Sequence, residues 1–184
     1  MSIVKPTRYL LLPGWQNSGP EHWQSRWETA LGFERVDQAD WKWPRRGDWM
    51  ARLDEVLLAD DERPAVLIAH SLGCQLVASW AEHSQHTARV SAALLVAPPD
   101  TEREGMPPQL HNWRPIRRSR LPFPALMVIS TDDPFCTPER ATEMAADWGA
   151  SMFVLGAFGH INGESGLGDW PQGQSLLQEL IQRR

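Results

Sequence analysis

The sequence of 184 residues has little cysteine, no long apolar run and no excess of basic residues. Its two cysteines, Cys74 and Cys136, are too few for the disulfide framework of a small secreted protein. Its longest purely apolar run, from Ala92 to Ala97, is far shorter than the roughly 20 residues that a membrane-spanning helix needs. The formal net charge is −5, and the basic residues form no large cluster. We therefore expect neither a membrane nor a nucleic-acid partner.

We also expect no secretion signal, because Met1 to Pro6 contain no apolar stretch of the necessary length. A cytoplasmic protein with reduced thiols is the simplest expectation. The length fits a single domain over residues 1–184, since a domain typically contains about 100–200 residues. Tryptophan is abundant, with ten against five phenylalanines and one tyrosine. Most of these indoles are expected in the core, with the rest lining a pocket.

Apolar runs recur along the chain and are separated by segments with helical spacing. Most of these runs are continuous rather than alternating, as in strands whose two faces are both covered by helices. They predict strands at Arg8–Leu12, Phe33–Asp37, Ala65–Ala69, Ala92–Ala97, Ala125–Ser130 and Met152–Leu155. The second strand is the only polar one, so we assign it to an edge of the sheet. This alternation predicts an α/β fold with a mostly parallel, six-stranded sheet.

Apolar residues at helical spacing predict helices between and after the strands. The first helix is expected to start near Pro20, with Ser18 as its capping residue. Further helices are expected around Trp49–Leu57, Leu76–Trp80, Ala141–Trp148 and Leu176–Ile181. Residues 98–122 contain six prolines and show no clear element. A loop of this length is typical of a lid, and a disordered insertion is the alternative that the composition leaves open.

The strongest chemical motif is Ala69-His70-Ser71-Leu72-Gly73, which follows an apolar strand and opens a helix. A serine on such a strand-to-helix turn exposes its hydroxyl at the helix N-terminus. The turn needs small residues two positions before and after the serine. Ala69 stands where glycine is usual, which is the smallest departure available. This context predicts that Ser71 is a nucleophile rather than an ordinary turn residue.

A nucleophilic serine needs a histidine base, which is itself oriented by a carboxylate, in the chain order serine, acid, histidine. Among the histidines after Ser71, His160 directly follows the last predicted strand. It is therefore expected at the same end of the sheet as the serine. Asp132 and Asp133 both close the fifth strand at that end, so either could supply the acid.

The negative charge that develops on an attacked carbonyl oxygen is stabilised by hydrogen-bond donors. The first expected donor is the backbone N–H of Leu72, the residue after the nucleophile. The second is expected in the loop after the first strand, where Gly14 allows a close turn and Trp15 presents its N–H. The side chains of Trp15 and Trp113 are candidate walls of a substrate pocket.

The sequence contains no dinucleotide or phosphate fingerprint, so we expect no cofactor. His83 and His86 are three residues apart at the end of the helix after Ser71, but no third ligand accompanies them. We interpret them as a solvated helix end and expect no metal site.

Four motifs together resemble one known family. They are Pro13-Gly14-x-x-x-Ser18-x-x-x-His22-Trp23-x-x-x-Trp27, the Ser71 pentapeptide above, Thr131-Asp132-Asp133-Pro134-Phe135 and Gly159-His160-Ile161-Asn162. From Pro13 to the last helix, the chain resembles the retinoblastoma-binding protein 9 / YdeN-like serine hydrolases. These are small α/β-hydrolases that lack the first two antiparallel strands of larger relatives. The resemblance implies the strand order 2-1-3-4-5-6, with helices on both faces of the sheet.

The resemblance also implies roles for three residues: Ser71 as nucleophile, Asp133 as acid and His160 as base. Pro134 supports the choice of Asp133, because a residue before proline is held in extended geometry. The implied activity is hydrolysis of a small carboxylic ester through an acyl-enzyme intermediate. Hydrolysis of an amide by the same route is the alternative within enzymes.

The family name also suggests a protein-binding role. Binding to pocket proteins normally uses Leu-x-Cys-x-Glu, whereas this chain has Leu72-Gly73-Cys74-Gln75-Leu76 inside the helix predicted after Ser71. An interaction module that has kept a hydrolase fold therefore stays an alternative without support from the sequence. The substrate, the size of its acyl chain and the oligomeric state are left open.

Overall fold

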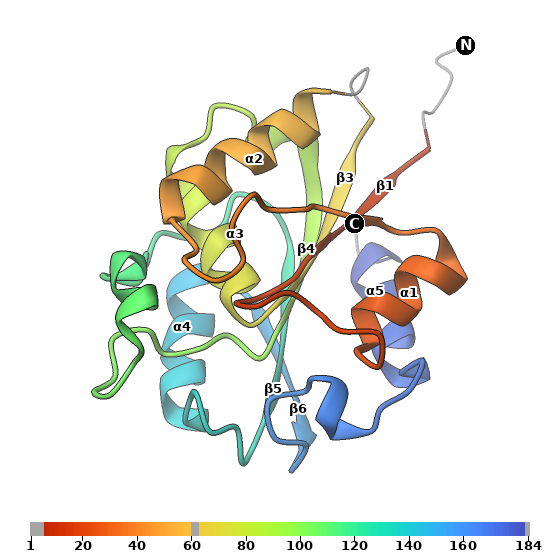
Figure 1. Cartoon of the computed structure of the whole chain (residues 1–184). Helices are drawn as coiled ribbons and strands as arrows, with labels where there is room; N and C mark the ends of the chain where they lie inside the picture. The colour runs from red at the N-terminus through yellow and green to blue at the C-terminus, as the bar shows by residue number, and fades with distance from the viewer. Residues whose placement is uncertain (1–5, 60–62, 183–184) are drawn as a thin grey trace.

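A computed structural model describes residues 6–59 and 63–182, which form three layers with a sheet between two layers of helices (Figure 1). The strands are β1 (Arg8–Leu12), β2 (Glu34–Arg35), β3 (Ala65–His70), β4 (Val90–Val96), β5 (Ala125–Ser130) and β6 (Ser151–Gly156). The helices are α1 (Trp23–Leu31), α2 (Arg46–Leu58), α3 (Leu72–His83), α4 (Pro138–Trp148) and α5 (Pro171–Gln182). Short 3-10 turns lie at Thr87–Arg89, Pro108–Trp113 and Gly163–Ser165. Residues 1–5, on which the expectation of no secretion signal mainly rests, lie outside the described residues.

The strands form a six-stranded parallel sheet in the order β2-β1-β3-β4-β5-β6, which confirms the predicted fold. The order reverses between β1 and β3, and ligands of such sheets bind beyond the carboxyl ends of the strands at this reversal. The polar strand β2 does lie at an edge. It is shorter than the predicted strand at 33–37, because only Glu34 and Arg35 pair with β1.

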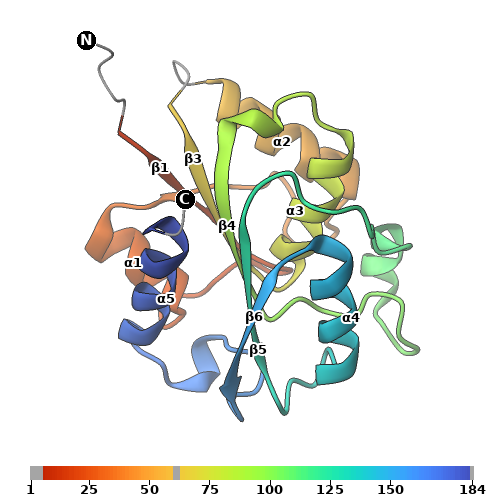
Figure 2. The same ribbon diagram turned by 180° about the vertical axis from the view of Figure 1, so that it is seen from behind.

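Successive residues of the central strands face opposite helical layers, which explains why these strands are continuous apolar runs. One layer contains α2, α3 and α4, and the other contains α1 and α5 (Figure 2). Leu10 and Leu12 belong to the core cluster of the first layer, whereas Leu11 belongs to that of the second. Every residue of β3 is buried. The Ser71 motif therefore follows a strand that is packed on both faces.

Most tryptophans do serve the core, as expected. The side chains of seven are fully buried: Trp23, Trp27, Trp49, Trp80, Trp113, Trp148 and Trp170. In the layer of α1 and α5, Trp23, Trp27 and Trp170 form a cluster with ring centroids 4.8–5.9 Å apart. This tryptophan cluster packs α1 against the chain segment that precedes α5.

The start of α1 differs from the prediction. His22 caps the helix, because its Nδ1 accepts a hydrogen bond from the backbone N–H of Gln24 at 3.1 Å. The preceding residues form a turn in which the His22 N–H donates to the Gly19 carbonyl at 3.0 Å. Ser18 instead donates its hydroxyl to the side chain of Gln24 at 2.8 Å. The predicted start at Pro20, with Ser18 as cap, is therefore wrong.

Within residues 6–59 and 63–182, no helix combines the length and the apolar character needed to cross a bilayer. The same ranges contain no group of three His, Cys, Asp or Glu side chains placed to hold a metal ion. Cys74 and Cys136 are both buried and free.

Candidate active site

Ser71 occupies the turn between β3 and α3, and we call residues 69–73 the Ser71 turn. Its backbone has φ 54° and ψ −123°, a conformation that is strained for a residue other than glycine. Glycines at two positions allow neighbouring segments of the chain to approach the Ser71 turn closely. A Cβ on Gly73 would lie 2.2 Å from the carbonyl oxygen of Leu12, and a Cβ on Gly14 would lie 2.7 Å from the Ser71 Cβ. The local sequence thus presents the serine hydroxyl at the N-terminus of α3.

The structure brings Ser71, Asp133 and His160 together. The Ser71 Oγ lies 2.7 Å from Nε2 of His160, and Nδ1 of His160 lies 2.9 and 3.0 Å from the two carboxylate oxygens of Asp133. An ionised carboxylate can only accept, so the neutral imidazole carries its proton on Nδ1. Its bare Nε2 then faces the serine hydroxyl, which donates to it. In this arrangement a histidine can remove the serine proton.

The neighbouring carboxylate, Asp132, has different partners. Its Oδ1 accepts hydrogen bonds from the Ser130 hydroxyl at 2.7 Å and from the Gly159 N–H at 2.8 Å. These two hydrogen bonds lower the pKa of Asp132 below its usual value. Asp132 therefore fastens the segment between β6 and α5, residues 157–170, which carries His160 and which we call the His160 loop.

The two N–H groups predicted to bind an oxyanion lie on adjoining turns. A Cβ on Gly14, next to Trp15, would lie 3.2 Å from the Leu72 nitrogen, so the loop after β1 closely approaches the start of α3. Among the residues that the structure describes, neither the Trp15 nor the Leu72 backbone N–H donates to a protein acceptor. Both are therefore available to a ligand oxygen. The Trp15 indole is fixed by donation from Nε1 to the Lys42 carbonyl at 2.9 Å.

Trp113 does not line the site, so this prediction is wrong. Its side chain is 1% exposed, lies edge-on to Trp49 at 5.4 Å and donates from Nε1 to the Pro44 carbonyl at 2.8 Å. The aromatic ring beside the imidazole is instead that of Phe135, with centroids 4.6 Å apart. Phe135 is 39% exposed, so its ring forms a wall of the site that sequence reasoning missed.

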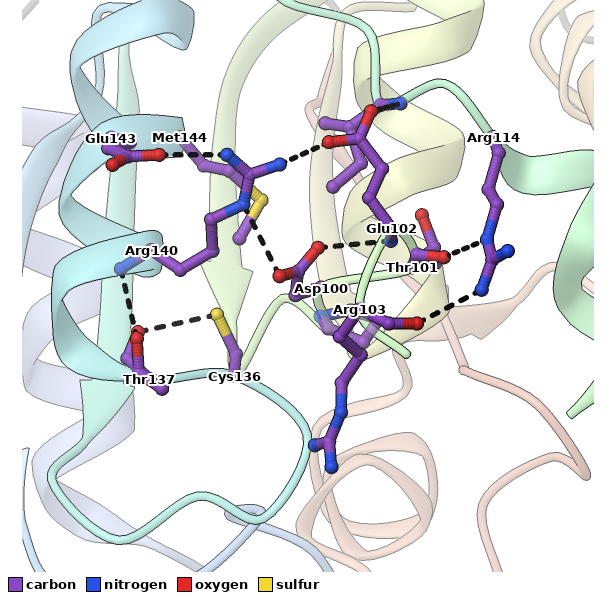
Figure 3. Close-up of polar contacts among 12 residues, drawn as sticks. Asp100, Thr101, Glu102, Arg103, Arg114, Cys136, Thr137, Arg140, Glu143 and Met144 are labelled. Atoms are coloured by element: carbon purple, nitrogen blue, oxygen red, sulfur yellow. Dashed lines mark hydrogen bonds and ion pairs between the residues drawn. The ribbon is translucent and has the colours of Figure 1, made fainter. Parts of the chain in front are cut away.

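The proline-rich segment 98–122 packs onto the core and is not a disordered insertion. Its buried apolar side chains belong to the same cluster as α2, α3 and α4 and are Met106, Leu110, Trp113, Ile116 and Leu121. Its start is tied to Arg140 of α4, whose guanidinium pairs with Asp100 at 3.4 Å and also with Glu102 (Figure 3). Arg103 donates to the Pro134 carbonyl, next to Asp133. The segment therefore packs against the core beside the site.

The two thiols are poor rivals of Ser71 as nucleophiles. Burial raises the pKa of Cys74 well above its usual value. Burial, with the nearby charges of Asp133 and Asp100, raises the pKa of Cys136 to about 12. Because the thiolate is the reactive form, both cysteines are inert near neutral pH.

Comparison with known proteins adds to this geometry. A family model described as serine hydrolase matches residues 9–179. A solved structure described as a YdeN-like hydrolase of Pectobacterium atrosepticum is 29% identical, with 96% of this chain and 91% of that chain covered and a TM-score of 0.83. The ydeN gene product of B. subtilis is 19% identical, with 97% and 100% covered and a TM-score of 0.71.

A third solved structure, the esterase domain of a Rhodothermus marinus protein, is 18% identical. The match covers 98% of this chain and 89% of the esterase domain, with a TM-score of 0.69. At such identities the second and third structures show the shared fold alone. A search of curated proteins finds no significant match. The expected resemblance to YdeN-like hydrolases is confirmed, whereas these matches do not carry the retinoblastoma-binding name.

Proposed function

The chain belongs to the serine hydrolase family and has the α/β-hydrolase fold, and from that premise we propose that it cleaves a small carboxylic ester through an acyl-enzyme on Ser71. The observation that carries the proposal is the distance of 2.7 Å between the Ser71 Oγ and Nε2 of His160, with Asp133 on the other imidazole nitrogen. A serine hydroxyl is a weak nucleophile, and an oriented base at this distance activates it.

In the first half-reaction, the Ser71 Oγ forms a bond to the ester carbonyl carbon while His160 takes the hydroxyl proton. The oxyanion of the tetrahedral intermediate accepts hydrogen bonds from the backbone N–H groups of Trp15 and Leu72. His160 then returns the proton to the alkoxy oxygen as the alcohol leaves, and Ser71 keeps the acyl group. Asp133 stays ionised, holds the imidazole in its Nδ1–H form and stabilises the imidazolium.

In the second half-reaction, water takes the place of the alcohol. His160 removes a proton from the water, and the water oxygen bonds to the acyl carbon. The Ser71 Oγ leaves with the proton from His160, and the carboxylic acid is released. Every step uses groups of this chain, so no cofactor is part of the proposal.

The surroundings of the reacting groups support a substrate with an apolar acyl group. The half-exposed ring of Phe135 lies against the His160 imidazole, with centroids 4.6 Å apart, and this aromatic surface suits an apolar acyl chain. That the protein acts in the cytoplasm stays a prediction from composition.

Activity-based labelling tests the proposal. A fluorophosphonate should modify the wild-type protein at Ser71 and nowhere else, as mapped by mass spectrometry. Ser71→Ala should abolish labelling and lower kcat for p-nitrophenyl acetate by about 10³-fold or more, because the nucleophile is lost. The variant should still fold, because only one hydroxyl is deleted. Ser119→Ala is the matched control, because it removes an exposed hydroxyl that contacts Glu82.

The outcomes separate the alternatives. Labelling at another residue, or an unchanged rate in Ser71→Ala, would show that Ser71 is not the nucleophile. A wild-type protein that is neither labelled nor active on esters would favour an interaction module. Matched p-nitrophenyl esters and p-nitroanilides of the same acyl group distinguish ester from amide hydrolysis, and we expect the esters to react faster.

A further inference from the structure

The His160 loop has to cross much of the sheet. It leaves β6 at an edge, yet the imidazole reaches Ser71 at the end of β3, with β4 and β5 in between. At about 4.8 Å between neighbouring strands, this return spans roughly 14 Å. The path is also strained, because Ile161 is β-branched and has φ 49°. Contacts beyond those of the imidazole with Ser71 and Asp133 must therefore hold the loop in place.

Two buried histidines supply such contacts at His160 itself. Nε2 of His70, the residue before Ser71, lies 2.9 Å from the backbone carbonyl oxygen of His160. Nδ1 of His70 lies 3.2 Å from Nε2 of His22. Nδ1 of His22 in turn lies 3.1 Å from the backbone nitrogen of Gln24. Each histidine is only 5% exposed, so water does not compete for these contacts.

These contacts form a chain of hydrogen bonds from the His160 carbonyl through His70 and His22 to the Gln24 nitrogen. The groups at its two ends determine the position of every proton in it. The His160 carbonyl can only accept, so Nε2 of His70 carries a proton. The Gln24 N–H can only donate, so Nδ1 of His22 is bare and its Nε2 carries the proton. The two requirements agree in the middle, where Nε2–H of His22 donates to bare Nδ1 of His70. A second proton on either ring would place two donors face to face.

The surroundings of His22 and His70 favour the neutral imidazoles that this chain of hydrogen bonds requires. Burial, with the positive charge of Arg35 and the nearby His160, lowers the pKa of His22 to about 3. Burial, with the neighbouring His22 and His160, also lowers the pKa of His70 well below its usual value, against the opposing effect of its bond to the His160 carbonyl. Both rings therefore stay uncharged over the pH range in which a histidine base works.

The next residues of α1 hold the loop further along. Nε1 of Trp23 donates to the Ile161 carbonyl at 2.9 Å, and Nε1 of Trp27 donates to the Asp169 carbonyl at 2.8 Å. Residues four apart share one face of a helix, so both indoles point to the same side of α1. The sequence motif His22-Trp23-x-x-x-Trp27 thus contributes three side chains to holding the His160 loop.

We propose that His22 and His70 are positioning residues, which as a neutral chain of hydrogen bonds fasten the His160 loop to the Ser71 turn and set the distance between His160 Nε2 and Ser71 Oγ. This inference rests on the proposed function of Ser71 and His160. The two residues neither touch the reacting atoms nor transfer a proton.

Amide side chains can separate the two nitrogens of His70. Glutamine places a donor near the position of Nε2, whereas asparagine is shorter and offers a group only near the position of Nδ1. His70→Gln therefore keeps the hydrogen bond to the His160 carbonyl, and His70→Asn loses it. We expect His70→Asn to lower kcat for p-nitrophenyl acetate by about 10- to 100-fold, because small displacements of reacting groups have effects of this size.

The pattern of kinetic effects identifies positioning. KM should change by less than about twofold in His70→Asn, because the substrate does not contact residue 70. His70→Gln should recover most of the lost kcat. His83→Asn, at the half-exposed far end of α3, is the control and should keep the wild-type rate. Equal losses in His70→Asn and His70→Gln, or full activity in His70→Asn, would overturn the proposal.

A measurement that needs no activity covers the case of a variant that does not fold. Nitrogen-15 NMR of the histidine-labelled wild-type protein and Ser71→Ala should show both His22 and His70 as Nε2–H tautomers from about pH 8 to about pH 5. An Nδ1–H tautomer, or protonation of either ring in that range, would also overturn it. Absence of fluorophosphonate labelling in the wild type contradicts the proposed function instead, and the spectra then still decide whether the chain of hydrogen bonds exists.

Discussion

The Ser71 turn and the His160 loop are held in place by opposite means. The Ser71 turn lies between two buried elements, and close contacts of backbone atoms at Gly14 and Gly73 determine its position. The His160 loop follows an edge strand, and hydrogen bonds from distant side chains fix it. The first region should therefore be sensitive to added volume, and the second to lost donors and acceptors.

The largest effect is expected where the His160 loop meets the carboxylate of Asp133. Asp133→Asn favours the imidazole tautomer with its proton on Nε2, so Ser71 loses its base. By analogy with a well-studied serine, histidine and aspartate set, kcat should fall on the order of 10⁴-fold while the fold is kept. Steady-state kinetics with a p-nitrophenyl ester measures this effect.

Asp132→Asn is the matched variant for Asp133→Asn. The amide oxygen can still accept the Gly159 N–H, so the loss should be much smaller. If Asp132→Asn proved the more damaging of the two, Asp132 rather than Asp133 would be the acid.

The second effect tests whether close backbone contacts determine the position of the Ser71 turn. In Gly14→Ala the new methyl group would lie 2.7 Å from the Ser71 Cβ and 3.2 Å from the Leu72 nitrogen, so one of the two turns must move. We expect the rate of fluorophosphonate labelling to fall by about 10²-fold. Gly19→Ala lies in the same loop with nothing within 4 Å of its Cβ and should label normally. Normal labelling of Gly14→Ala would contradict the steric account.

The smallest effect concerns the stability of the fold and tests the hydrogen bonds that hold the His160 loop. The pKa of His22 is about 3 in the folded protein, against about 6.5 in an unfolded chain. As the pH falls below about 6.5, the unfolded state binds the proton first, so the free energy of unfolding decreases until about pH 3. At pH 5 the free energy of unfolding is for this reason ~2 kcal/mol lower than at neutral pH.

His22→Asn carries no such group but can still cap α1. Between about pH 7.5 and pH 5, its free energy of unfolding should therefore fall by about 2 kcal/mol less than that of the wild type. Urea unfolding followed by tryptophan fluorescence measures the difference. Parallel pH dependences would show that His22 is not a buried neutral ring.

Much of the fold could be predicted because the sheet is covered on both faces. Two-sided burial produces the continuous apolar runs, and β5 matches its predicted bounds, 125–130. The meeting of Ser71, Asp133 and His160 could be expected because each follows the carboxyl end of a parallel strand. The strand order itself came from the resemblance, since periodicity does not specify which strands are neighbours.

The features that the sequence did not reveal depend on distant partners. His70 contacts residues 48 and 90 positions away, so nothing near it in the chain indicates a role. The one feature of the sequence that could have indicated the contacts of His70 was His22, which stands beside Trp23 in the first motif. Trp113 was misplaced because the proline-rich segment has no periodicity from which its buried side can be read. The cap of α1 was misassigned because an imidazole took the role of a hydroxyl.

The tryptophan cluster has an optical consequence. Trp23 lies at 62° and 66° to the rings of Trp170 and Trp27, with centroids 5.0 and 4.8 Å apart. Electronic transitions of indoles this close together mix, so circular dichroism should contain an exciton couplet whose size follows these angles. Since Trp23 also donates to the Ile161 carbonyl, a shift of the His160 loop that turns the Trp23 ring should change that signal. We therefore expect circular dichroism to follow such movements of this loop without an added label.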